Sequence, residues 1–150
     1  MTTITLAKAL KLKAKLAGDL NSAYYAVSKN NSIIVGNKRH IDINATLAEM
    51  AEVKKKLIEL KLAITVGNEK IMRSLIELSE LKDTLGKISS INTTEGKHRE
   101  YGDSFSEFEV VLTQGFINET AKALKTQIEE LQDSIDSYNH STMITVPFEI

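Results

Sequence analysis

Cysteine and tryptophan are absent from this sequence of 150 residues, and proline occurs only once. The absence of cysteine excludes disulfide bridges, thiol catalysis and zinc sites that need thiolates. Because proline is scarce and glycine occurs only seven times, few positions interrupt a helix, and long helices are expected. Long apolar runs are missing as well, so the sequence predicts no membrane-spanning helix.

The remaining composition is typical of a soluble globular protein, with 42% hydrophobic and 26% charged residues. The length predicts a single helical domain that covers residues 1–150. Near the N-terminus lysine recurs every two or three positions among Leu and Ala, whereas a secretion signal has a continuous apolar centre. We therefore expect a basic amphipathic helix that belongs to the fold, and a cytoplasmic location.

The net charge of −1 conceals two halves of opposite sign. Residues 1–75 hold 13 basic and 6 acidic side chains, a balance of +7, and residues 76–150 hold 6 basic and 14 acidic side chains, a balance of −8. Two interpretations compete: the basic half binds nucleic acid or another polyanion, or the halves pack together as complementary faces within or between subunits. The second is favoured, because the cations are mostly lysines spread along helices without interleaved aromatic residues.

Four helices are predicted from the spacing of the apolar residues. They run from Leu6 to Val27, from a capping box at Thr46–Glu49 to Gly67, from a second capping box at Ser74–Glu77 to Ile88, and from Ile117 to Tyr138. The last helix keeps alternating steps of four and three residues along its whole length. The link between the second and third helices is short, which predicts that these two are antiparallel neighbours.

Three other stretches have β character. A small hairpin or extended arm is predicted where Ile33–Val35 and Ile41–Ile43 flank a Gly36-Asn37 turn. A half-buried strand is predicted at Phe105–Leu112, and a short terminal strand at Met143–Val146. The expected fold is mainly α: a four-helix antiparallel bundle with coiled-coil seams plus one or two short β-hairpin or strand elements. Such narrow seams often pack between chains, so a homo-oligomer is predicted.

Two glycine-led basic loops hold two of the three arginines and two of the three histidines. Arginine presents a planar fork of donors that matches phosphate or carboxylate, lysine adds a point charge, and glycine lets backbone amides approach an anion. A tyrosine after the second loop can stack on a base or ring. The candidate ligand-binding residues are Lys38, Arg39, His40, Lys97, His98, Arg99 and Tyr101, with Asn92, Thr93 and Thr94 as further contacts.

The alternative interpretation of these loops is two solvated turns, since loops are generally polar and exposed. A metal site from His98, His140 and a carboxylate is conceivable on paper only, so neither a metal nor a cofactor is expected. A set of Ser104, His98 and Asp103 lies within one loop, where the geometry of a catalytic triad is rarely reached. No nucleophile elbow, Walker loop or dinucleotide fingerprint occurs, so the sequence argues against an enzyme.

The order of these features resembles that of the septicolysin-like family of small helical bacterial and phage proteins. The resemblance is carried by the basic first helix, Ser74-Leu75-Ile76-Glu77, the strand at Phe108 to Leu112, the helix Ile117–Tyr138 with its closing Ile135-Asp136-Ser137-Tyr138-Asn139, and Ser141-Thr142. It covers most of the chain and is best from residue 74 onward. The resemblance implies a helical fold, its name implies a cytolysin, and no catalytic residue is carried over.

The leading functional hypothesis is a non-catalytic homo-oligomer that binds or sequesters a small anionic ligand, phosphorylated or nucleotide-like, through the two basic loops. The alternative is a structural or interaction protein that acts through its helical seams. A membrane-acting cytolysin comes third, because the first helix carries Tyr24 and Tyr25 where interfacial helices usually carry tryptophan or phenylalanine. Binding to nucleic acid or to a membrane is disfavoured.

Overall fold

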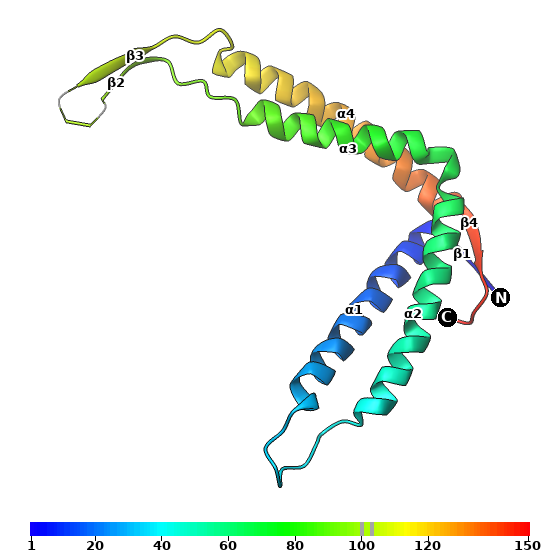
Figure 1. Ribbon diagram of the computed structural model, residues 1–150. Helices are drawn as coiled ribbons and strands as arrows, with labels where there is room; N and C mark the ends of the chain where they lie inside the picture. The colour runs from blue at the N-terminus through cyan, green and yellow to red at the C-terminus, as the bar shows by residue number, and fades with distance from the viewer. Residues whose placement is uncertain (100, 103) are drawn as a thin grey trace. The chain divides into compact units, whose positions relative to one another are not determined.

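The computed structural model describes residues 1–99, 101–102 and 104–150, and the fold is mainly α (Figure 1). The elements are β1 (Thr2–Thr5), α1 (Leu6–Asn31), α2 (Ile43–Gly67), a 3₁₀ turn η1 (Glu69–Ile71), α3 (Met72–Ser89), β2 (Gly96–Arg99), β3 (Phe105–Phe108), α4 (Gln114–Ser141) and β4 (Met143–Val146). The helices pack in antiparallel pairs, accompanied by two small two-stranded antiparallel sheets. The predicted mainly α fold is therefore confirmed.

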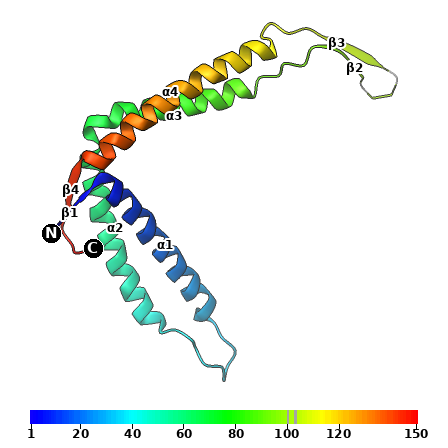
Figure 2. The ribbon, with the colours of Figure 1, turned by 180° about the vertical axis from the view of Figure 1, so that it is seen from behind.

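The chain divides into two compact units, residues 1–70 with 136–150 and residues 71–135. In the first unit α1 packs along α2, and β1 pairs antiparallel with β4 from Thr2↔Val146 to Thr5↔Met143. Figure 2 shows the two strands side by side next to the start of α1. The sequence analysis found β4 and missed β1, although Thr-Thr-Ile-Thr is rich in the β-branched residues that strands favour.

The core of the first unit lies where this small sheet meets the helices. Leu6, Leu60 and Val146 are fully buried, and Ile4 and Ile144 pack beside them. Alternation along β4 buries every second side chain, as expected for a strand with one face on a core. The sheet thereby anchors the N-terminal and C-terminal segments of the chain on the helix pair.

Both predicted capping boxes are wrong. Helix α2 begins earlier than Thr46, because Asp42 caps it and accepts a hydrogen bond from the Ala45 amide at 3.0 Å. Thr46 donates its hydroxyl to the Asp42 carbonyl at 2.8 Å instead of capping the helix itself. Helix α3 also begins before Ser74, directly after η1, and has no side-chain cap. Each helix therefore starts before the capping residue that its motif predicted: α2 starts at Ile43 and α3 at Met72.

The predicted hairpin at residues 33–43 is also wrong. Helix α1 continues to Asn31, and residues 32–42 form an irregular loop with a turn closed by the Asn37 amide on the Ile34 carbonyl at 3.0 Å. Gly36 has a φ of 93° in this turn, a value that glycine adopts without strain. The apolar side chains of Ile34 and Val35 are exposed, so no core face existed to align two strands.

The second unit contains α3, α4 as far as Ile135, and a hairpin of β2 with β3. Leu78, Ile117 and Ile135 are buried between the helices, whereas most of the remaining seam residues are only half-buried. The strand predicted at Phe105–Leu112 ends at Phe108. Its partner β2 lies in a stretch for which the sequence predicted a polar loop. Strand β2 escaped detection because its residues are almost all polar and exposed, which leaves no hydrophobic alternation to read.

None of the described helices is both long enough and apolar enough to span a bilayer.

Two glycines in helices provide a matched test of the packing. A Cβ added at Gly67 would lie 2.7 Å from Cγ2 of the buried Ile144, whereas a Cβ at Gly86 meets nothing within 4 Å. We expect Gly67→Ala to lower the free energy of unfolding by roughly 1–3 kcal/mol through overpacking. Gly86→Ala should raise it by about 0.5–1 kcal/mol, because alanine favours the helix. Urea unfolding of both variants checks this, and a stabilised Gly67→Ala would contradict the packing described here.

Candidate functional site

The predicted site residues lie in both compact units. Lys38, Arg39 and His40 belong to the loop between α1 and α2 in the first unit. Lys97, His98 and Arg99 lie on β2 in the second unit, and Tyr101 follows in the turn. The two groups therefore belong to different units, and a binding site that uses both loops stays a prediction.

Arg39 ties its loop to the end of α1. Its Nε donates to the carbonyl of Asn30 at 2.8 Å, and its Nη2 donates to the carbonyl of Asn31 at 2.9 Å. The last carbonyls of a helix have no partners within the helix, and a cation there also interacts favourably with the helix dipole. Arg39 thus closes the C-terminal end of α1 and holds the following loop against it.

Lys38 and His40 flank this anchoring arginine and are exposed. Neither forms a hydrogen bond or an ion pair with any residue that the structure describes. Their side chains can contact a ligand from solution without first breaking an internal interaction.

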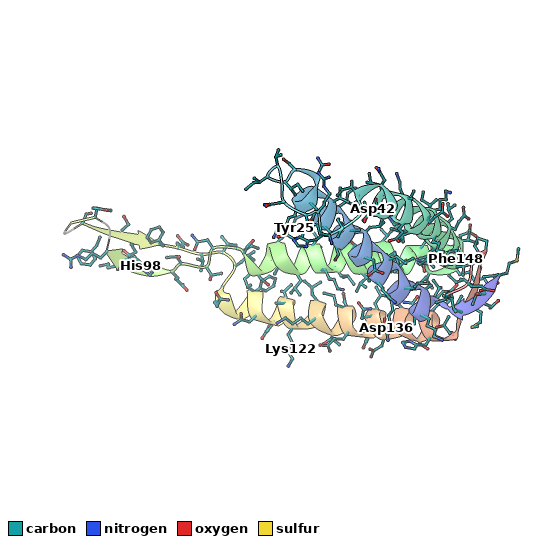
Figure 3. The ribbon with its side chains drawn as sticks, turned by 90° about the horizontal axis from the view of Figure 1, so that it is seen from below. Tyr25, Asp42, His98, Lys122, Asp136 and Phe148 are labelled. Atoms are coloured by element: carbon teal, nitrogen blue, oxygen red, sulfur yellow. The ribbon has the colours of Figure 1, made fainter. Side chains whose placement is uncertain are left out.

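The second basic group lies on a strand, and not in a loop as predicted. His98, labelled in Figure 3, donates from Nε2 to the carbonyl of Glu95 at 2.9 Å. Its ring stands edge-on to Phe108, with centroids 5.7 Å apart and an interplanar angle of 71°. Arg99 donates from Nε to the carbonyl of Gly102 at 2.9 Å. These contacts stabilise the hairpin and its turn.

The remaining candidates of this loop differ in their surroundings. Lys97 is exposed opposite Glu107 in the strand register, and Tyr101 is fully exposed. Asn92 accepts from the amide and the hydroxyl of Thr94, at 2.9 and 2.7 Å, which makes a local turn of the kind that asparagine favours. Thr93 donates its hydroxyl to Gln114 at 2.5 Å. Asn92, Thr93 and Thr94 therefore shape the connection between α3 and β2.

Residues 1–99, 101–102 and 104–150 contain no cluster of three or more His, Asp or Glu side chains that could hold a metal ion. His140 donates from Nδ1 to the carbonyl of Asp136 at 2.7 Å, within its own helix. Asp103, the third member of the set with Ser104 and His98, lies outside the described residues.

One pKa shift is resolved, and it belongs to a helix surface. A hydrogen bond to Asp83 on the next turn of α3 raises the pKa of Lys87 above its ordinary value, and the charge of Asp83 adds to this. Both side chains are largely exposed, so this is an ordinary surface ion pair.

Sequence analysis missed an exposed apolar stripe on α2. Four large apolar residues of this helix are exposed, on the side opposite its buried face: Leu47, Ile58, Leu62 and Val66. A signal was present in the sequence, because these residues follow one another at steps of eleven, four and four, which keeps them on one side of a helix. It was overlooked because the regular three-four seam of the same helix accounts for its other apolar residues.

Comparison of the chain with protein-family models, with curated proteins and with solved structures gave no match. The resemblance to the septicolysin-like family therefore stays a prediction.

Replacement of Arg39 separates an anchoring role from a ligand-binding role. We expect Arg39→Ala to destabilise the protein by roughly 0.5–1.5 kcal/mol, because two helix carbonyls lose a charged donor at an exposed site. Lys38→Ala is the matched control and should be neutral, since Lys38 has no such contact. Thermal and urea unfolding measure both, and equal stability of the two variants would refute the anchoring role.

Proposed function

We propose that this chain is a non-catalytic interaction protein that works as a homo-oligomer through its helical faces. The observation that carries the proposal is that helix α2 is apolar on two opposite sides, while only one of them is covered by its own unit.

The covered side of α2 faces α1 and the small sheet. It contains Met50, Leu57, Leu60 and Ile64, all of which are buried. The opposite side exposes Leu47, Ile58, Leu62 and Val66 by 44%, 48%, 57% and 65%. Single exposed apolar residues are common on protein surfaces, but several large ones on one side of a helix are typical of an interface.

The two ends of the exposed stripe share one spacing, which favours a second copy of this chain as its partner, and Ile58 nearer the middle would lie opposite Lys55 of that copy. Leu47 and Ala51 are four residues apart, and so are Leu62 and Val66. When two α2 helices lie antiparallel, Leu47 therefore faces Val66 of the second copy, and Ala51 faces Leu62 of the second copy. Such self-complementarity is what a two-fold symmetric dimer requires.

The second unit supports association as well. Leu124, Ile128 and Leu131 of α4 lie on its seam, yet they are only half-buried against α3. Two helices alone form a single layer, and a helix pair normally buries its seam fully when another layer covers it. An additional copy would supply that layer.

Two acidic substitutions on the exposed stripe test the proposal. We expect the wild-type chain to form an oligomer, and Ile58→Glu with Leu62→Glu to reduce its mass, because charges in an apolar interface remain unpaired. The mass is measured by size-exclusion chromatography with light scattering. Val35→Glu is the control, since Val35 is fully exposed in the loop before α2, and it should leave the mass unchanged.

Two outcomes would overturn the proposal: a monomeric wild-type chain, or an unchanged mass in the double variant. Circular dichroism of the double variant shows whether its helices are retained, which separates a lost interface from a lost fold.

Binding of a small anion at the basic loops is a second candidate function. It is favoured by Lys38 and His40, which lie without internal partners on a loop that Arg39 and the turn at Gly36 hold in place. In this function the ligand is phosphorylated or nucleotide-like.

Thermal unfolding with pyrophosphate tests this second function. A ligand that binds only the native state raises the melting temperature, so pyrophosphate should stabilise the wild-type chain. The combined variant Lys38→Ala, His40→Ala should lose this gain while its melting temperature without pyrophosphate stays the same. An equal gain in the variant would exclude this loop as the binding site.

A further inference from the structure

The hairpin of β2 and β3 forms an arm that extends beyond the ends of α3 and α4, as Figures 1 and 2 both show. Two strands joined only to each other are marginally stable in water and normally need a further strand or a helix to pack against. The arm also exposes large apolar side chains, among them Phe105 and Phe108 on β3 and Val111 just beyond it. An arm with these properties is suited to packing against another surface.

Carboxylates surround one of these aromatic residues. A hollow on the arm is lined by Gly96, Phe108 and three glutamates, Glu95, Glu107 and Glu109. All three glutamates are exposed, and none forms an ion pair with another residue that the structure describes. The hollow therefore brings three carboxylates together with an aromatic ring that packs edge-on to His98, and Lys97 lies across the strand pair from Glu107.

The first unit carries a surface of the opposite kind. A groove of about 460 Å³ lies along α1, with Ile4, Leu12 and Ile150 among its apolar lining. Its charged residues are Lys8, Lys11 and Lys15, which recur at steps of three and four and so lie on one side of the helix. These lysines form no ion pair within the described part of the chain.

We propose that the arm of one copy docks into this lysine groove of a second copy, with Phe108 against the apolar lining and the glutamates against the lysines. The proposal rests on the proposed function, in which copies of this chain associate, and it names a further contact between them. Charge complementarity selects the occupant, because three carboxylates around an apolar ring match three ammonium groups around an apolar floor.

The dimensions agree with this pairing. Lys8 and Lys15 lie about 10 Å apart along the helix axis, from a rise of about 1.5 Å per residue. Glu107 and Glu109 are about 7 Å apart in extended chain. Two carboxylates of the arm can therefore reach two lysines of the groove at once. Because arm and groove differ, the contact joins copies head to tail, and it closes into a ring or continues along a chain of subunits.

Charge reversal on each surface tests the contact. The groove variant carries Lys8→Glu, Lys11→Glu and Lys15→Glu, and the arm variant carries Glu95→Lys, Glu107→Lys and Glu109→Lys. Both are made in the chain with Ile58→Glu and Leu62→Glu, so that the exposed stripe of α2 does not link copies. Native mass spectrometry should show the parent chain associated and each variant monomeric, because like charges then face each other.

Mixing the two variants gives the decisive result. In the mixture an arm meets a groove of opposite charge only between unlike chains, so complexes with equal numbers of both variants should form. Raising NaCl from about 0.1 M to about 1 M shortens the Debye length from about 10 Å to about 3 Å and should weaken these complexes at least about tenfold. A mixture that stays monomeric would overturn the proposal, and so would a parent chain that is already monomeric.

A control with the same change in net charge excludes a general charge effect. Lys70→Glu, Lys122→Glu and Lys125→Glu change exposed lysines outside the groove, and this variant should associate as its parent does. Loss of association in the control would also overturn the proposal. The proposed function is tested separately by replacing only Ile58 and Leu62 in the wild-type chain. If the mass of the oligomer then stays unchanged, the proposed function fails.

Discussion

Each helix of this protein has one helical neighbour within its unit, and the rest of the structure depends on this constraint. A pair of helices is a single layer, and one layer cannot enclose an apolar seam from all sides. In the first unit the small sheet of β1 and β4 supplies the missing cover near Leu6 and Leu60, which are fully buried there. On the side of α2 that faces away from α1, and at most positions of the seam between α3 and α4, apolar side chains stay partly or wholly exposed.

The basic residues that looked most like a ligand site are divided between two tasks. The guanidinium groups of Arg39 and Arg99 donate to backbone carbonyls, at the end of α1 and in the turn of the hairpin. Lys38 and His40 lack such contacts and stay accessible. In each loop the arginine would therefore hold the backbone in place, and the neighbouring cations would contact an anionic ligand. In the proposed assembly, the charge imbalance between the halves of the chain would provide complementary surfaces on associating copies.

The sequence predicted an element well where many nearby residues define it, and poorly where one side chain or a distant partner defines it. Helix α4 was identified because its apolar residues repeat in steps of four and three, and such periodicity is local and redundant. The start of α2 was missed because a cap depends on one side chain, and Asp42 rather than Thr46 occupies that position. Strand β2 was missed because its partner, and not its own composition, defines it. Lys38, Arg39 and His40 lie in a loop as predicted, whereas Lys97, His98 and Arg99 lie on β2, and the hydrogen bonds of neither group were foreseeable.

The sequence by itself determined the mainly α character, the approximate extent of the four helices and the terminal strand at β4, because each is encoded by the period of nearby apolar residues. Only the tertiary structure decided that β1 pairs with β4 across the length of the chain, that Arg39 closes α1, and that α2 exposes a second apolar side. These features depend on contacts between segments that are separate in sequence or on which side of a helix receives a neighbour. Local spacing shows that a face is apolar, but the arrangement of the other elements decides whether it is covered.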